Sequence, residues 1–206
     1  MSFEHWVTFA AATMVLLIIP GPTILLVISY GLGQGWRAAF PTSVGVALGD
    51  FTAMTLSMLG IGALLAASAT LFTVLKLAGA AYLVWLGISL WRAGGSLNAK
   101  PVTESKGVGR MIAHAWLVTA LNPKSITFFV AFLPQFLDRS DDVLTQMVIF
   151  EATFLTLAFA NSLGYGLLAS RARNLVRSER VVRGFNRTGG ALLIGAGVVT
   201  ATTRAA

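Results

Sequence analysis

The sequence predicts an all-helical membrane protein with six transmembrane helices, arranged as two inverted repeats of three helices each. Three observations lead to this fold class. Apolar residues make up 56% of the 206 residues and charged residues only 11%, against about 25% charged residues in soluble domains. Apolar stretches long enough to cross a bilayer follow one another with short connections. A proline break in one helix and an acidic residue in the next recur at the same spacing in both halves.

The first predicted span, residues 6–32, is interrupted by Pro20-Gly21-Pro22. Proline lacks an amide donor and clashes with the preceding turn, so this tripeptide breaks a helix. In lipid, such a break is tolerated where it is buried in protein or lines a wet cavity. We therefore interpret the segment as two half-helices that meet near the middle of the membrane. A simple proline kink is the alternative.

The second predicted span, residues 40–67, contains Gly45 and Gly49, a spacing that lets another helix pack closely. Asp50 follows directly, about ten residues into the span and so ~15 Å along a helix. An ionisable side chain at that depth is costly and is a functional candidate. A structural hydrogen bond to a neighbouring helix is its alternative role.

The second half of the chain has the same organisation. Its first span is broken by Asn122-Pro123, which Lys124 follows at once, and its second contains Glu151 and Asn161. A loop with six arginines comes next, and we interpret it as a short interfacial helix facing anionic lipid. The remaining predicted spans are residues 71–91, 111–136, 143–169 and 188–203, and the arginine loop is residues 170–187.

The two halves align when they are shifted by 101 residues. Pro22 and Asp50 are 28 residues apart, and so are Pro123 and Glu151. Because each half has an odd number of spans, the repeated half must insert upside down. The chain is then one transporter domain, residues 1–206, with repeat one at 1–91, a loop at 92–110 and repeat two at 111–206. Paired broken helices at corresponding positions indicate the substrate site of a transporter.

The chemistry of these parts favours a small zwitterion that is moved with or against protons. Half-helix amino ends suit a carboxylate, and half-helix carboxyl ends suit an ammonium group or another cation. Asp50 and Glu151 add negative charge or carry a proton, and Lys124 adds positive charge unless it reaches to the interface. Alternatively, Asn122 and Asn161 simply satisfy backbone groups that the breaks set free, or bond between helices.

Charge counting predicts the topology. The three loops on one side carry eleven lysines and arginines, whereas the opposite side carries two, or three if Lys76 lies at the interface. The positive-inside rule then places both termini on the periplasmic side of a cell inner membrane. The net charge of +7 is explained by these loops, so we expect no nucleic-acid partner.

The residue inventory argues against a cofactor, a metal centre or an enzyme. The chain has no cysteine, which excludes disulfides and thiol chemistry. Its two histidines, His5 and His114, are far apart in sequence, and no nucleophile is paired with either. We expect no cofactor and no metal site.

These motifs together resemble the LysE/RhtB family of amino-acid exporters. The resemblance rests on Pro20-Gly21-Pro22, on Gly45-x-x-x-Gly49-Asp50, on residues 76–83 (KLAGAAYL), on Asn122-Pro123-Lys124 with Phe128-Phe129, and on residues 133–136 (LPQF), and it covers most of the chain. It implies an inner-membrane exporter of amino acids or close derivatives, driven by proton exchange. Many members have an acidic or amide residue directly after Pro-Gly-Pro, where this chain has Thr23.

We therefore expect a secondary exporter of small, neutral amino acids or derivatives that works by proton antiport. Asp50 is the expected proton-coupling or ammonium-binding acid, Glu151 is a second candidate acid, and the two breaks form the site. The expected partners of the protein are the substrate, protons and the bilayer. Its small-residue helix faces also allow a homo-oligomer. An exporter of basic amino acids, a cation or metal exporter of the same superfamily, and a membrane enzyme or scaffold are the alternatives. The full set of candidate site residues is Pro20, Gly21, Pro22, Thr23, Asp50, Asn122, Pro123, Lys124, Glu151 and Asn161.

Overall fold

The structure is a computed structural model, and it describes residues 2–67, 69–92, 99–104, 107–137, 141–171 and 179–202. Within these ranges every regular element is a helix, which confirms the all-helical prediction. The elements are the α-helices α1 (Phe3–Ile18), α2 (Pro22–Gln34), α3 (Ala39–Ala67), α4 (Ala69–Arg92), α5 (Val108–Ala120), α6 (Pro123–Phe132), α7 (Val143–Arg171) and α9 (Glu179–Thr202), with 3₁₀ turns η1 (Trp36–Ala38) and η2 (Leu133–Gln135).

The first proline motif unwinds the chain. α1 ends at Ile18, α2 begins at Pro22, and the two helices are bent by 55° relative to each other. Ile19 between them has an extended backbone, as expected of a residue that precedes proline. Pro22 is the first residue of α2, a position whose amide would have no partner within the helix. The motif therefore makes a break with two helix ends, and the simple-kink interpretation does not hold.

The second proline motif does the same between α5 and α6. α6 begins with Pro123, and the side chain of the preceding Asn122 accepts a hydrogen bond from the Lys124 amide. This is the usual capping arrangement of asparagine at a helix start. Both predicted breaks are thus real interruptions, one between α1 and α2 and one between α5 and α6.

Two unbroken segments, Trp36–Gly60 and Val143–Arg171, are long and apolar enough to cross a membrane. The bent pair α1–α2 is a third candidate when it is taken as one span. These segments are counted in the described part of the chain only. The six-span inverted repeat therefore stays a prediction.

α4 and α9 pack along each other. A Cβ atom built on Gly87 of α4 would lie 2.6 Å from the Gly190 carbonyl oxygen of α9, so the two backbones nearly touch. α9 begins at Glu179, so residues 179–187 of the arginine loop are helical, as its interpretation as a short helix expects, but they are continuous with the last predicted span. Arginine is a good helix former, so the helix extends past the apolar run and carries Arg180, Arg183 and Arg187. Residues 172–178 of that predicted loop lie outside the described residues.

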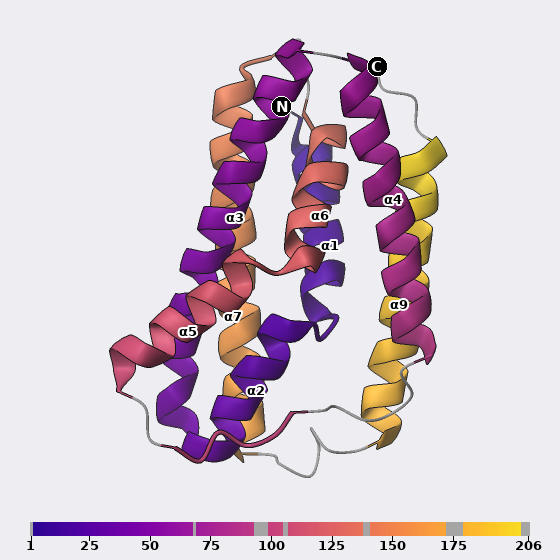
Figure 1. Cartoon of the computed structure of the whole chain (residues 1–206). Coiled ribbons are helices and arrows are strands. Elements are labelled where there is room, and N and C mark those ends of the chain that lie inside the picture. The colour runs from indigo at the N-terminus through magenta and orange to yellow at the C-terminus, as the bar shows by residue number, and fades with distance from the viewer. Residues whose placement is uncertain are drawn as a thin grey trace.

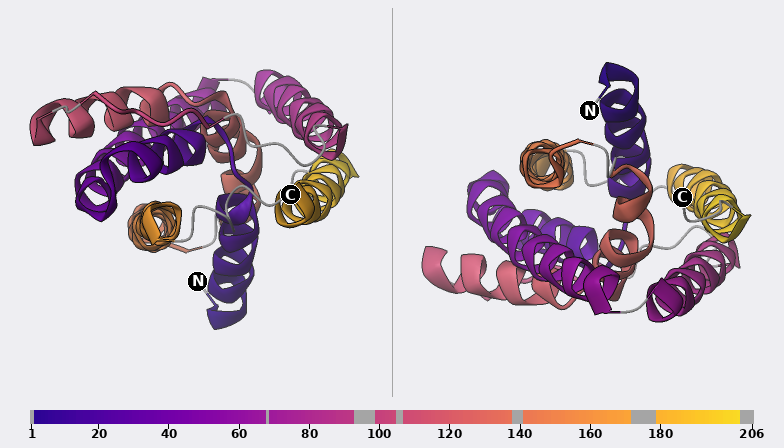
Figure 2. Two further views of the ribbon diagram at one scale, coloured as in Figure 1. Left: turned by 90° about the horizontal axis from the view of Figure 1, so that it is seen from below. Right: turned by 90° about the horizontal axis from the view of Figure 1, so that it is seen from above.

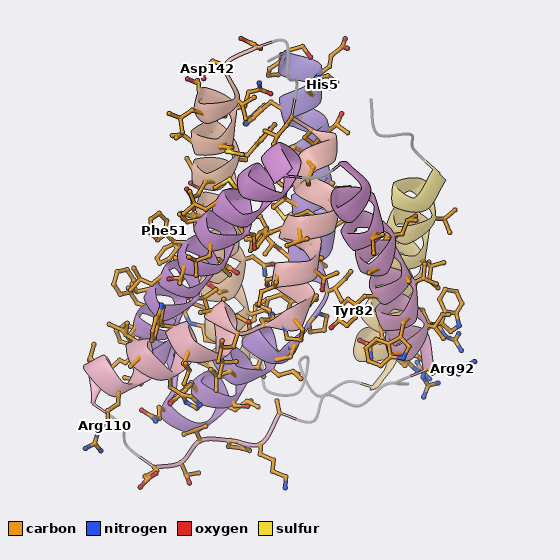
Figure 3. All side chains as sticks on the ribbon, turned by 45° about the horizontal axis from the view of Figure 1, so that its top comes forward. His5, Phe51, Tyr82, Arg92, Arg110 and Asp142 are labelled. Carbon is orange, nitrogen blue, oxygen red and sulfur yellow. The ribbon has the colours of Figure 1, made fainter. Side chains whose placement is uncertain are left out.

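The helices form an elongated bundle in which α1 starts and α9 ends at the same end (Figure 1). Figure 2, which looks along the bundle, places α4 and α9 together at one side, α3 with α5 at the other, and α6 between them. Figure 3 shows Arg92 and Arg110 at the end opposite to His5 and Asp142. The end of α4 and the start of α5, which carry Arg92 and Arg110, therefore lie on one side, which we call the arginine-bearing end of the bundle.

An aromatic core holds α1, α6 and α7 together. Phe9 and Phe150 have ring centroids 4.4 Å apart, and those of Phe129 and Phe154 are 4.8 Å apart. All four side chains are fully buried. Because α1 and α6 begin or end at the two breaks, this cluster fixes how the breaks face each other.

Candidate functional site

The two breaks meet in the middle of the molecule. Asn122 Nδ2, at the second break, donates to Thr23 Oγ1 at the first break over 3.1 Å. Thr119 Oγ1 donates to the same oxygen over 3.3 Å. All three residues are buried. The amino ends of α2 and α6 are thus joined by side-chain hydrogen bonds, although they are about 100 residues apart in sequence.

Two glycines of α3 allow α5 to pack closely against α3. A Cβ atom at Gly45 would lie 2.4 Å from the Ile112 carbonyl oxygen, and one at Gly49 would lie 2.7 Å from the Trp116 carbonyl oxygen. Real side chains do not tolerate such distances, so α5 can lie on α3 because these positions lack a side chain. This confirms the packing interpretation of the Gly45/Gly49 pair. It also sets Asp50, the next residue of α3, beside the α5–α6 break.

Asp50 is almost completely buried and incompletely paired. Asp50 is 3% exposed, and it lines the same cavity as Ser125 in the first turn of α6. Its Oδ1 atom has no hydrogen-bond partner. Buried polar atoms are nearly always paired, so an unpaired one calls for an explanation. Asp50 Oδ1 therefore keeps the capacity to accept a hydrogen bond from a group in the cavity that Asp50 lines.

The carboxyl end of α1 is covered by side chains from the second half of the chain. Lys124 Nζ donates to the carbonyl oxygens of Leu16 and Ile19 over 2.9 and 2.7 Å. Asn161 Nδ2 donates to the Leu17 carbonyl oxygen over 2.9 Å. These bonds satisfy carbonyl groups that the break deprives of helical partners.

Tyr165 completes this set and was missed by the sequence analysis. Its hydroxyl donates to the Ile18 carbonyl oxygen over 2.7 Å. Tyr165 lies four residues after Asn161 on α7, so the two side chains share a helix face. That spacing is the signal that could have identified it. The last four residues before Pro20 thus all have carbonyl groups that accept from a side chain.

The prolines of the motifs act through the backbone. Pro20 is buried, whereas Pro22 and Pro123 are exposed. Gly21 precedes α2 without any side-chain cap, and the Lys124 side chain passes over it, with its Cδ atom 3.4 Å from where a Cβ would be. The amino end of α2 is therefore left without a side-chain acceptor. Such an end carries a positive partial charge that suits an anion.

A small cavity of about 20 Å³ lies between these groups. Its polar lining includes Asp50 and Lys124, together with Thr23, Asn122, Ser125 and Asn161. This space is about that needed by a single water molecule. The cavity is therefore closed to molecules much larger than water in this arrangement of the helices. Two larger hollows, of about 320 and 400 Å³, are lined mainly by apolar side chains and by none of these polar residues.

Glu151 does not line this cavity. Its Oε1 atom accepts a hydrogen bond from Thr55 Oγ1 over 2.6 Å, so it joins α7 to α3. The structure thus separates the two acids that the repeat spacing paired: Asp50 lies at the breaks and Glu151 lies at a helix contact. In the described parts of the chain, no group of three or more histidine, aspartate and glutamate side chains could hold a metal ion.

Comparison with known proteins adds a family and several relatives. The family model of LysE type translocators matches residues 14–204. A membrane protein of Vibrio cholerae serotype O1, described as uncharacterized, is 34% identical over 205 residues, which is 100% of both chains. The homoserine/homoserine lactone efflux protein of Salmonella typhimurium is 31% identical over 204 residues, 99% of each chain. The leucine efflux protein of Enterobacter sp. (strain 638) is 29% identical over 154 residues, 74% of this chain and 73% of that protein. No solved structure matches the chain.

Proposed function

Because this chain belongs to the family of LysE type translocators, we propose that it exports small, neutral amino acids or close derivatives across the cell inner membrane by proton antiport. The family and the efflux proteins among its relatives indicate a transporter rather than an enzyme. Homoserine and leucine, named for two of those relatives, are amino acids with uncharged side chains. They support the neutral class over the basic one.

The observation that carries the proposal is the unpaired, buried Oδ1 atom of Asp50 at the junction of two helix breaks. The surrounding groups offer both halves of a zwitterion site. The uncapped amino end of α2 suits a carboxylate, and the carboxyl end of α1 suits an ammonium group. Asp50 adds the negative charge that binds an ammonium group or carries the exchanged proton.

The charges near the cavity disfavour the alternative substrates. A dibasic amino acid needs acidic groups for two cations, and Asp50 is the one carboxylate among the described residues that line the cavity. A metal cation would meet the Lys124 ammonium at close range, and like charges there repel strongly. A zwitterion satisfies Asp50 and Lys124 together.

The proposed topology puts the arginine-bearing end of the bundle in the cytoplasm and both termini in the periplasm. The closed cavity then lies between the two sides, as alternating access requires. Substrate passes when the half-helices around the breaks move in turn. Packing of small-residue faces between copies would give the homo-oligomer that we also propose.

Counterflow in proteoliposomes tests the proposal. Vesicles preloaded with one amino acid from a panel are supplied with the same labelled compound at two pH values, with wild type and with Asp50→Asn. We expect uptake of neutral amino acids by wild type that differs between the two pH values and is lost in the variant. Absence of amino-acid flux with folded protein would refute the proposal, and flux independent of pH would refute proton antiport.

A further inference from the structure

We propose that Lys124 acts as a tethered competitor of the substrate: its ammonium group occupies the place of the substrate's ammonium group in the closed, empty protein and moves to Asp50 when substrate binds. This inference rests on the proposed function, since it assigns the substrate's orientation within the same site. It gives Asp50 the role of the acid that receives Lys124. It also gives the carbonyl groups at the end of α1 the role of the ammonium subsite.

The present position of Lys124 is that of a bound ammonium ligand. Its Nζ atom donates to the carbonyl oxygens of Leu16 and Ile19, 2.9 and 2.7 Å away, at the carboxyl end of a half-helix. The ammonium group thus lies at the negative end of a helix dipole and donates to two carbonyl groups, of which that of Leu16 also accepts from the Ile19 amide. A substrate ammonium group has the same charge and donors. It cannot share these two oxygens with Lys124, because two cations at that separation repel each other.

Asp50 is ready to receive the displaced lysine. Its Oδ1 atom is buried without a hydrogen-bond partner, and both Asp50 and Lys124 line the same cavity. Burying a carboxylate oxygen without a protein partner is costly, and a lysine ammonium group is a donor that removes this cost. Asp50 Oδ1 is therefore a suitable second partner for Lys124 within the cavity that both residues line.

Lys124 has space beside it at the first break, and it shares one cavity with Asp50. The aliphatic part of Lys124 passes beside Gly21, which contributes no side chain to the space next to its Cδ, Cε and Nζ atoms. A lysine side chain can change partners by rotating its own bonds. The backbone of α6 can therefore stay in place during the exchange, held by the Asn122 cap.

The exchange balances the charges in both states. In the empty protein Lys124 lies on the α1 carbonyl groups and Asp50 Oδ1 is free. In the loaded protein Lys124 pairs with Asp50, the substrate ammonium group lies on the carbonyl groups, and the substrate carboxylate faces the uncapped amino end of α2. In a rival pose, Lys124 binds the substrate carboxylate directly. Lys124 then occupies the α1 carbonyl groups before substrate binds and leaves them without a partner afterwards. The two poses make opposite predictions for a neutral residue at position 124.

The test is equilibrium binding by calorimetry of a transported amino acid and of its decarboxylated amine, to purified protein in detergent. The proteins are wild type, Lys124→Met and Asp50→Asn, with Lys100→Met as the matched control on an exposed lysine. Substrate binds only to the fraction of protein molecules in which Lys124 has left the ammonium subsite. Removing Lys124 therefore lowers the apparent Kd by a factor equal to the inverse of that fraction. We expect Lys124→Met to tighten binding of both compounds by about tenfold or more. Asp50→Asn should weaken binding of both, and Lys100→Met should change neither.

Each other outcome overturns the inference. Weaker binding of the amino acid by Lys124→Met, with amine binding unchanged, shows that Lys124 holds the carboxylate. Unchanged binding of both compounds shows that Lys124 only supports the break. If Lys124→Met does not yield monodisperse protein, Lys124→Gln keeps a hydrogen-bond donor without the charge, and the same tightening is expected. Failure of wild type itself to bind any amino acid instead refutes the proposed function, so the two failures are distinguishable.

Discussion

Asn122 Nδ2 donates to Thr23 Oγ1 over 3.1 Å, and this bond joins the two broken helices directly. Asn122 also caps α6 by accepting from the Lys124 amide. Each half of the chain thus completes the break of the other half. The two residues occupy positions that sequence inspection assigns to separate helices, and their bond makes one site out of two motifs.

We expect this bond to couple the two breaks energetically. Asn122→Ala loses the bond to Thr23 and the cap of α6, and should lower the free energy of unfolding by about 1–3 kcal/mol. Thr23→Val removes the hydroxyl alone and should cost less. The double variant should show a coupling energy of about 0.5–3 kcal/mol in a double-mutant cycle, measured by denaturant unfolding in detergent micelles. Strict additivity would mean that the contact does not stabilise the fold.

Glycine substitutions in α3 test the close packing that positions Asp50. Gly45→Ala would bring a Cβ atom within 2.4 Å of the Ile112 carbonyl oxygen, so the helices must separate. We expect a lower melting temperature and weaker export. Gly60→Ala is the matched control, because a Cβ atom there meets nothing within 4 Å and alanine favours a helix more than glycine does. Equal effects of the two substitutions would contradict the packing argument.

The two acids of the repeat should differ in function. Asp50→Asn should reduce amino-acid counterflow by at least about tenfold, equivalent to about 1.4 kcal/mol of lost interaction, because Asp50 lines the cavity. Glu151→Gln should leave most of the counterflow, since Glu151 contacts Thr55 away from the cavity. Rates in proteoliposomes with matched protein content provide the measurement. A larger loss for Glu151→Gln than for Asp50→Asn would reverse our assignment.

The start of α7 should show an acid-dependent stability. A hydrogen bond from the Thr145 hydroxyl, helped by the Leu144 and Thr145 amides, lowers the pKa of Asp142 below its ordinary value of 3.8. Because the pKa of Asp142 is lower in the folded state, its carboxylate stabilises the fold at pH values above the ordinary pKa of aspartate. This contribution is lost as the pH falls through the lowered pKa. Asp142→Ala should therefore reduce the melting temperature at about pH 7. The difference in melting temperature between the variant and wild type should shrink when the pH falls below the ordinary pKa of aspartate. A difference that is independent of pH would show that the charge of Asp142 is not involved.

Topology can be tested with single cysteines, because the chain has none of its own. Ser2→Cys lies before α1 at the end that carries His5, and Gly107→Cys lies next to the start of α5 at the arginine-bearing end. We expect a membrane-impermeant thiol reagent to label the first in intact spheroplasts and the second only after lysis. The reverse pattern would place the termini in the cytoplasm.

The all-helical architecture, the two breaks and the deeply placed acid could be predicted from the sequence, whereas the six-span inverted repeat stays a prediction. These follow from local properties that no tertiary contact can change: proline has no amide donor, a bilayer demands long apolar stretches, and Asp50 lies deep within one of them. The equal spacing of Pro22 to Asp50 and Pro123 to Glu151 likewise indicated which elements correspond. The sequence did not show that the predicted arginine helix and the last apolar segment form one helix, α9, because arginines continue a helix beyond its apolar part.

Tertiary structure alone decided how these parts are combined. The repeat spacing predicts that Asp50 and Glu151 have equivalent positions. In the structure, however, Asp50 lines the cavity, whereas Glu151 accepts a hydrogen bond from Thr55. The partners of Lys124 are backbone carbonyl groups of α1, more than one hundred residues earlier in the chain. Carbonyl groups carry no residue type, so a sequence pattern cannot show which of them a side chain will reach. That depends on the angle between half-helices and on the glycines that let α5 approach α3, which are properties of the folded chain.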